Sequence, residues 1–397
     1  MISTQDPSEL SEPKERVAHP FRTLRELVDF VSGKSLPALE PEEGPRSEAL
    51  PFPFLAIVGQ KEMKLALLLG LINPSVGGIL LVGPRGTAKT TAVRSLLDIL
   101  PKVERSLCYN GCLPEDVETS GIDAVCPDCA KKYAEGQPLS ALDRVRLIEL
   151  PLNSRLEDVV GGIDERLTVS NERLRVKRGI LAQADRNLLY IDEINLLSDD
   201  IVNSILDAAA QGSFTVRRGP VSATYHARFV LVGSMNPEEG RLRPQILDRF
   251  GLRVVVRGLS IPTERLEAYR RVKSYLANPR AMSMAFGEET MAATEEIQSA
   301  RAILPKVVLP DKVAKPAIKL VQKMGIDSLR AEISWFEAAR AYAAADNRLK
   351  VIPEDLHAVA SMTLRLRRST FMADYFIDQE EEEVEMNSLL KSMHGRK

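Results

Sequence analysis

A short glycine-containing segment, Gly83–Thr90, carries the residues of a phosphate-binding loop. It reads GPRGTAKT and matches the pattern G-x-x-x-x-G-K-[ST], except that Ala88 replaces the second glycine. In such a loop, backbone N–H groups surround phosphate oxygens, the lysine neutralises the β- and γ-phosphates, and the hydroxyl ligates Mg²⁺. We therefore expect Lys89 to bind phosphate and Thr90 to hold Mg²⁺. The full set of loop residues expected at a nucleoside triphosphate is Gly83, Pro84, Arg85, Gly86, Thr87, Ala88, Lys89, Thr90 and Thr91.

The context of this loop disfavours a chance glycine-rich turn. The apolar run GILLV precedes it and a helical pattern follows, which is the strand-loop-helix arrangement that phosphate binding requires. Alanine at position 88 keeps the side chain small, but it adopts a positive φ less readily than glycine does.

Two adjacent carboxylates, Asp192 and Glu193, end a second apolar run in the sequence LLYIDEIN. Asp192 is expected to hold Mg²⁺, and Glu193 to orient and polarise the attacking water. Considered alone, the pair could simply cap the next helix. A third run, FVLVGS, leads into Asn236, whose amide could sense the γ-phosphate or form an ordinary Asn-Pro turn. Together with the phosphate loop, these residues indicate nucleotide hydrolysis.

Four cysteines form a separate cluster in the sequence. Cys108 and Cys112 are spaced C-x₃-C, Cys126 and Cys129 are spaced C-x₂-C, and thirteen residues separate the pairs. Two close pairs can place four thiolates in the tetrahedron that structural Zn²⁺ prefers. A regulatory disulfide at the C-x-x-C pair and four unligated thiols are the alternatives. We expect a zinc ion, because a reducing compartment favours metal binding over disulfides. We expect it to be structural, because four thiolates leave no open position for a catalytic water.

The elements that position these residues follow from hydrophobic patterning. Short apolar runs bounded by polar residues are typical of a parallel sheet covered by helices on both faces. The expected strands are Gly78–Val82, Arg146–Leu150, Asn187–Ile191 and Phe229–Gly233. Beyond about residue 260, helical patterns replace the strand signals. The expected helices are Gln60–Ile72, Thr90–Leu100, Thr263–Leu276, Glu289–Ile303, Pro310–Met324, Ile333–Ala345 and Pro353–Arg367.

Three regions are expected along the chain. Residues 1–50 form an arm with one amphipathic helix, Phe21–Ser32, and a linker rich in Pro, Glu and Ser. Residues 51–265 form the α/β nucleotide-binding domain, with a cysteine-rich insertion at about 105–135. Residues 266–397 form a helical domain that ends in an acidic tail.

Composition excludes several classes of protein. The 397 residues include 53 Lys and Arg against 55 Asp and Glu, a net charge of −2, so a basic nucleic-acid-binding surface is not expected. The longest strongly apolar run, Leu65–Ile72, is too short to span a bilayer. Because the first residues are polar and acidic, we expect no signal segment. We therefore expect a cytoplasmic protein without membrane contact.

The order of these segments resembles the AAA+ ATPases and, more specifically, the ATPase subunit (subunit I) of magnesium chelatase. The stretches that carry the resemblance include LLYIDEINLLSDDIVNSILDAAAQG, ARFVLVGSMNPEEGRLRPQILDRFGL and SLRAEI, and it extends from about Phe52 to Ile333. It implies an α/β nucleotide domain with a displaced helical lid, assembled as a ring that is usually a hexamer. The loop departs from the common family form GDRGTGKST at Pro84 and Ala88.

The resemblance also implies residue roles. Gly59 and Gln60 would lie beside the adenine, and Asn236 would be sensor 1. Arg249, in LDRF, would be an arginine finger that reaches a neighbouring subunit, and Arg330, in SLRAEI, would be sensor 2. From the residues alone, Arg249 could instead form a surface salt bridge with Asp248, and Arg330 could be a solvated helix residue.

The implied function is an ATP- and Mg²⁺-dependent motor that drives Mg²⁺ insertion into protoporphyrin IX for (bacterio)chlorophyll biosynthesis. The implied partners are a second AAA+ subunit of von Willebrand type and a large porphyrin-binding subunit. One alternative is a chelatase-related chaperone of the MoxR kind that remodels or metallates proteins. Another is a zinc-stabilised scaffold with a degraded phosphate loop, which the joint presence of Lys89, Asp192 and Arg249 disfavours.

Overall fold

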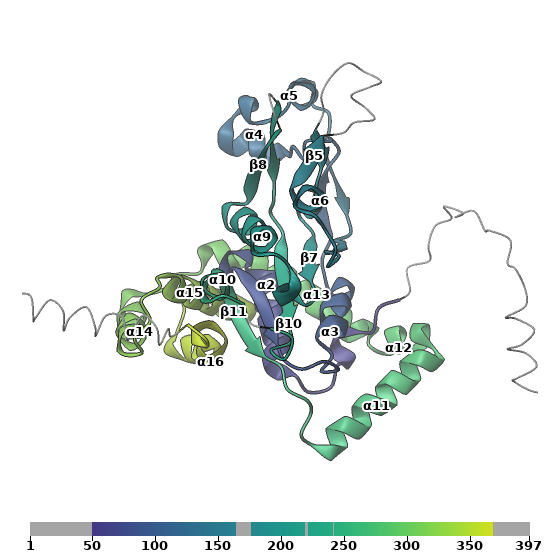
Figure 1. Cartoon of the computed structure of the whole chain (residues 1–397), viewed down its shortest axis with the longest axis vertical. Coiled ribbons are helices and arrows are strands. Elements are labelled where there is room, and N and C mark those ends of the chain that lie inside the picture. Colours follow the sequence, from purple (N-terminus) through teal and green to yellow (C-terminus); the bar gives the residue numbers. More distant parts are fainter. Residues whose placement is uncertain (1–49, 164–175, 219–220, 241, 368–397) are drawn as a thin grey trace, which may run out of the picture. The chain divides into compact units, whose positions relative to one another are not determined.

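The computed structural model describes residues 50–163, 176–218, 221–240 and 242–367 (Figure 1). The expected arm with its helix Phe21–Ser32 and the acidic tail lie outside these residues. Among the helices in the described ranges, none combines the length and the apolar character that a membrane span requires.

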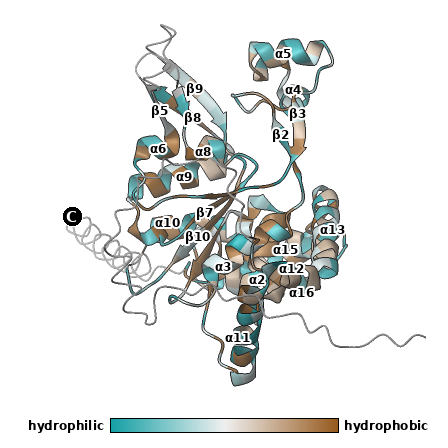
Figure 2. Ribbon diagram, turned by 90° about the vertical axis from the view of Figure 1, so that its right-hand side faces the viewer, coloured by the Kyte–Doolittle hydropathy of each residue, from teal (hydrophilic) through white to brown (hydrophobic). Residues whose placement is uncertain are grey.

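A five-stranded parallel sheet organises the nucleotide-binding part and confirms the expected fold class. The strand order is β11-β1-β10-β7-β4. The strands are β1 (Gly78–Val82), β4 (Leu147–Glu149), β7 (Leu188–Ile191), β10 (Val230–Met235) and β11 (Phe250–Val255). Figure 2 shows the apolar character of the central strands β7 and β10. β11 was not expected from the sequence, because the charged Arg253, which is fully buried in the fold, interrupts its apolar run.

Helices cover both faces of the sheet. Alternate residues of β1 lie in different hydrophobic cores: Ile79 and Leu81 pack in one, Leu80 and Val82 in the other. The first core includes residues of α2 (Lys61–Ile72) and α3 (Lys89–Ser95), and the second includes residues of α9 (Asp199–Gln211). The expected helix Thr90–Leu100 is shorter than predicted, because its last residues tighten into a 3₁₀ turn, Leu96–Asp98.

The chain after residue 260 is helical, as expected. Its helices are α11 (Pro262–Ala277), α12 (Pro279–Ala285), α13 (Gly287–Ile303), α14 (Asp311–Lys323), α15 (Arg330–Ala345) and α16 (Pro353–Leu364). The sequence patterns missed the short α12. Trp335, the single tryptophan of the chain, is buried in α15 and donates a hydrogen bond to the carbonyl oxygen of Leu356 over 2.8 Å. This contact joins α15 to α16.

Three antiparallel strand pairs project from the α/β part, and the sequence patterns predicted none of them. The pairs are β2 (Val103–Ser106) with β3 (Ser140–Asp143), β5 (Gly161–Ile163) with β6 (Val176–Arg178), and β8 (Ser213–Arg218) with β9 (Val221–His226). Two short helices, α4 (Pro114–Ser120) and α5 (Pro127–Ala134), lie between β2 and β3 together with the four cysteines. The β2–β3 pair therefore forms the stem of the cysteine-bearing segment.

We predict that Gly251→Ala destabilises the fold. A Cβ atom at this position of β11 would lie 1.8 Å from the carbonyl oxygen of Val76, so the backbone would have to shift. Overpacking of this kind destabilises by about 1–3 kcal/mol, measurable by urea unfolding. Gly287→Ala at the start of α13 is the control, because a Cβ there meets nothing within 4 Å. Equal stability of the two variants would contradict the prediction.

Candidate nucleotide-binding site

The phosphate loop connects β1 to α3 and has the backbone of a phosphate-binding turn. Gly83 packs so closely on the end of β11 that a Cβ would lie 2.1 Å from the carbonyl oxygen of Val256. Ala88 adopts a left-handed conformation with φ 66° and ψ 20°. The replacement of glycine by alanine therefore leaves the loop geometry in place but introduces conformational strain, which is about 1–2 kcal/mol for an L-residue in this region.

The Lys89 side chain folds back into the loop. Its Nζ atom donates hydrogen bonds to the carbonyl oxygens of Gly83 and Pro84 over 2.7 and 2.8 Å, and the residue is 8% exposed. Burial lowers the pKa of Lys89, and the nearby carboxylates of Asp192 and Glu193 oppose that shift. The loop thus holds an ammonium group at the place where a phosphate-binding loop needs one.

Asp192, at the carboxyl end of β7, is surrounded by hydroxyl groups. Its two carboxylate oxygens accept hydrogen bonds from Thr90 Oγ1 over 3.2 Å, from Tyr190 over 2.9 Å and from the Ser234 hydroxyl. Burial opposes ionisation, but these three hydroxyls hold the pKa of Asp192 below its ordinary value. An ionised carboxylate beside a threonine hydroxyl offers the hard oxygen ligands that Mg²⁺ prefers. The residues present therefore fit a magnesium nucleotide.

Glu193 and Asn236 lie on the neighbouring strand ends. The Glu193 carboxylate forms a salt bridge with Arg85 at 3.1 Å, and its backbone N–H donates to Ser234 Oγ over 3.2 Å. Asn236 is 4% exposed, and its side-chain oxygen accepts from the N–H of Glu238 over 3.3 Å. One pocket unites these groups: it is lined by Arg85, Gly86, Thr87, Ala88, Lys89, Thr90, Thr91, Asp192, Glu193, Ser234, Met235 and Asn236.

Sequence reasoning missed the two hydroxyl residues that bind Asp192. Tyr190 lies within an apolar run and Ser234 ends another, so the patterns indicate only that both belong to strands. One signal was available: Tyr190 stands two residues before Asp192, and Ser234 stands two residues before Asn236.

Of the residues predicted for the nucleotide site, Gly83 and Pro84 of the loop itself and four residues from other segments do not line this pocket. Gln60 donates to the carbonyl oxygen of Arg257 over 2.7 Å, and Gly59 lies against Leu259. Arg249, at the end of α10 (Pro244–Arg249), and Arg330, at the start of α15, also do not line it. The structure therefore places none of these four residues in the lining of the phosphate pocket of the same chain.

Arg249 does not form the surface salt bridge with Asp248 that the sequence left open as an alternative. Arg249 pairs with Asp207 of α9 at 2.6 Å, whereas Asp248 is bound by Arg367 at 2.8 Å and lies 3.5 Å from Arg330. The reason is geometric, because adjacent residues of a helix point in different directions.

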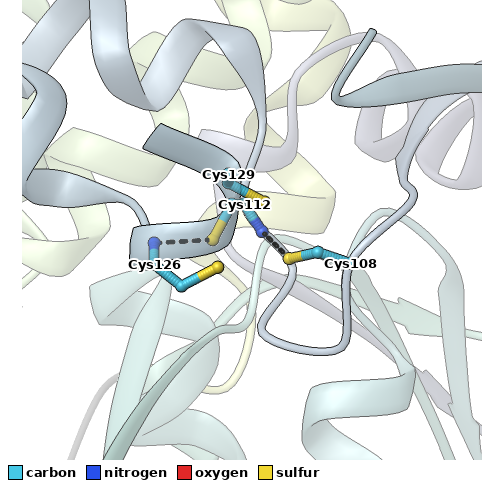
Figure 3. Close-up of side chains that lie close together, drawn as sticks. All are labelled: Cys108, Cys112, Cys126 and Cys129. Atoms are coloured by element: carbon cyan, nitrogen blue, oxygen red, sulfur yellow. Dashed lines mark hydrogen bonds between the residues drawn. The ribbon is translucent and has the colours of Figure 1, made fainter. Parts of the chain in front are cut away.

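The four cysteines converge (Figure 3), with all four Sγ atoms within 4.8 Å of one another. Backbone N–H groups donate to sulfur at Cys108 and at Cys112, each over 3.3 Å. Burial disfavours the Cys108 thiolate, but hydrogen bonds from Ser106 and Cys112 lower its pKa to about 7. Burial raises the pKa of Cys112 to about 12. All four are free thiols, and tetrahedral Zn–S bonds of about 2.3 Å would require S···S distances of about 3.8 Å.

The sheet order, the phosphate loop after β1, the carboxylates after β7 and the amide after β10 define an AAA+ ATPase. Family models agree: the MCM P-loop domain matches residues 164–257, and the AAA lid domain matches residues 315–388. A crystal structure of a candidate ATPase from Cytophaga hutchinsonii covers 79% of the chain and 84% of its own, with 22% identity and a TM-score of 0.51. It shares this fold.

Curated relatives define the family more narrowly. The magnesium-chelatase subunit ChlI homolog of Methanocaldococcus jannaschii is 41% identical over 81% of this chain and 87% of its own. The magnesium-chelatase 38 kDa subunit of Acidiphilium rubrum is 40% identical over 80% of this chain and 90% of its own. The chain belongs to the family of magnesium-chelatase ATPase subunits.

We predict opposite effects of glycine–alanine exchange at two loop positions. Ala88→Gly should stabilise the protein by about 1 kcal/mol, because glycine adopts the left-handed conformation without strain. Gly86→Ala should destabilise by a similar amount through φ alone, since φ is 77° and a Cβ would meet nothing within 4 Å. Urea unfolding without nucleotide measures both. A stabilising Gly86→Ala would contradict the geometry of the loop.

Proposed function

We propose that this chain is the ATP-driven motor of a magnesium-chelatase complex, in which ATP turnover drives partner subunits to insert Mg²⁺ into protoporphyrin IX. The observation that carries the proposal is membership of the chelatase ATPase family together with an intact phosphate loop and acidic pair. The names of these relatives disfavour a MoxR-type chaperone, and the joint presence of Lys89, Asp192 and Glu193 in one pocket disfavours a scaffold with a degraded loop.

In the proposed mechanism, each pocket residue has one task. Lys89 binds the β- and γ-phosphates, and Thr90 and Asp192 hold Mg²⁺, which neutralises phosphate charge when bound. Glu193 orients the attacking water, and Asn236 holds the γ-phosphate or that water. Gly59 and Gln60, which lie before α2, contact the base.

The positions of Arg249 and Arg330 support a ring assembly. Both lie outside the pocket of their own chain, so we propose that they complete the site of a neighbouring subunit in a hexamer. Positive charge supplied in this way stabilises the charge that develops on the transferred phosphoryl group. We propose that residues 51–265 form the nucleotide domain and residues 266–397 the lid, and that the partners are a von Willebrand-type AAA+ subunit and a large porphyrin-binding subunit.

Reconstitution with the cognate partner subunits tests this proposal. Wild-type protein should support ATP-dependent formation of Mg-protoporphyrin IX, followed by fluorescence. Arg249→Ala should lower ATP turnover by about 10³-fold, the range found when an arginine finger is removed. Arg243→Ala is the matched control, because its side chain is 74% exposed and forms a salt bridge with Asp199 at 2.8 Å, outside the pocket.

Two results would contradict the assignments separately. If wild-type protein hydrolyses ATP but does not stimulate porphyrin metallation, the proposed chelatase function is wrong, while the assignment as an ATPase stands. Undiminished ATP hydrolysis by Glu193→Gln would remove the proposed role of that carboxylate.

We further propose that Cys108, Cys112, Cys126 and Cys129 bind one structural Zn²⁺ ion. Support comes from the convergence of the four sulfur atoms and from the small core around them, whose buried members are Cys112, Val125, Cys129 and Leu139. So few apolar residues do not stabilise two short helices without a cross-link.

Metal analysis of purified full-length protein should find about one zinc ion per chain, and Cys129→Ser should remove it. Ser120→Ala, at an exposed position of the same segment, is the control and should retain the metal. A disulfide between Cys126 and Cys129 in zinc-free native protein would support the redox alternative instead.

A further inference from the structure

The segment between the paired strands β2 and β3, residues 107–139, is here called the cysteine module. Beyond its stem, it contacts the ATPase core through two acidic residues at the start of α4. Glu115 forms a salt bridge with Arg228 at 2.9 Å and a second with Arg186. Asp116 forms one with the same Arg228 nitrogen at 3.2 Å, and its carboxylate lies 3.3 Å from the imidazole Nε2 of His226. The module is therefore fastened to the core by a concentrated set of ion pairs.

Arg228 is the centre of this set. Its backbone N–H donates to Asp185 over 2.9 Å, and its guanidinium lies 3.3 Å from both oxygens of the same carboxylate. Burial would lower the pKa of Arg228, but the three surrounding carboxylates raise it, so the guanidinium remains charged. The side chains of Asp185 and Asp116 are only 11% exposed, which limits the screening of these pairs by water.

These ion pairs lie at the amino ends of the two strands that carry the site. Asp185 and Arg186 lead into β7, and Arg228 leads into β10. The N–H of Arg186 donates to the carbonyl oxygen of Arg228 over 2.7 Å, which joins the two strand entrances directly. At their other ends, β7 presents Asp192 and β10 presents Ser234, whose hydroxyl binds it.

A second contact joins the module to another strand pair. The backbone N–H of Arg178, at the end of β6, donates to the hydroxyl of Tyr109 over 3.2 Å, and the Arg178 guanidinium lies 5.6 Å from the centre of the Tyr109 ring. Tyr109 follows Cys108 directly. The position of this ring is thus tied to the cysteine cluster.

We propose that the cysteine module is a metal-dependent clip that holds β7 against β10, and that Arg228, through Glu115 and Asp116, is a positioning residue for ATP hydrolysis. The inference rests on the proposed ATPase roles of Asp192 and Glu193 and on the proposed metal. Zinc at the four cysteines fixes the position of α4, and Glu115 and Asp116 of α4 fix the Arg228 side chain. Arg228 in turn joins the residues that precede β7 to those that precede β10. A displacement of about 1 Å between catalytic groups is enough to lower turnover by up to about 10²-fold.

The test compares two double variants of the full-length protein. Glu115→Gln with Asp116→Asn removes the negative charge of the clip, while the amide oxygen introduced at position 116 still accepts the hydrogen bond that Asp116 receives from the N–H of Leu113. Glu118→Gln with Asp123→Asn makes the same change of charge at exposed residues of the module and is the matched control. The measurements are zinc content, kcat and KM for ATP, and amide hydrogen exchange without nucleotide.

We expect the clip variant to retain zinc and its KM for ATP, to lose about 10-fold in kcat, and to exchange amide hydrogens faster around residues 185–191 and 228–233. Protein freed of zinc by chelation should show the same faster exchange, and the control should match the wild type. Unchanged kcat and exchange in the clip variant would overturn the clip. Unchanged exchange after loss of zinc would overturn its metal dependence, whereas wild-type protein without ATP turnover would overturn the proposed function itself.

Discussion

The Ser234 hydroxyl joins the two strands that carry the chemistry. It donates to the carboxylate of Asp192 and accepts from the N–H of Glu193, so one side chain at the end of β10 sets the position of both acidic residues at the end of β7. This bridge exists only because the strands are parallel neighbours, which brings their carboxyl ends to the same edge of the sheet. The alignment of β7 and β10 is therefore the constraint on which the site depends.

The charged groups of the pocket have partners within the chain before any nucleotide binds. The Lys89 ammonium donates to loop carbonyl oxygens, and Arg85 forms salt bridges with both Glu193 and Glu239. A bound phosphate would replace carbonyl oxygens around Lys89 with stronger, charged acceptors. Such a site favours an anionic ligand through a few placed cations, which agrees with a chain whose overall charge is close to zero.

Asp248 links the helical region to the end of the sheet. Ser328 donates to its carboxylate over 2.6 Å, Arg367 binds it at 2.8 Å, and burial of the carboxylate is outweighed by these partners, which lower its pKa. Asp248 lies in α10, directly before Arg249, the arginine proposed to reach a neighbouring subunit. The contacts of Ser328 and Arg367 with Asp248 therefore attach the C-terminal helical region to the helix that carries Arg249.

Local patterns determined much of this protein: the phosphate loop, the acidic pair after β7, the apolar strands and the C-terminal helices all follow from neighbouring residues. The close spacing of the cysteines likewise indicated their convergence. Tertiary structure alone decided which side chains meet across strands, such as Ser234 with Asp192, Arg249 with Asp207, and Arg228 with Glu115. These contacts join residues more than forty positions apart, where periodicity carries no signal. The strand β11 escaped prediction because its buried Arg253 donates to the carbonyl oxygens of Arg365 and Leu366, more than 110 positions further along the chain.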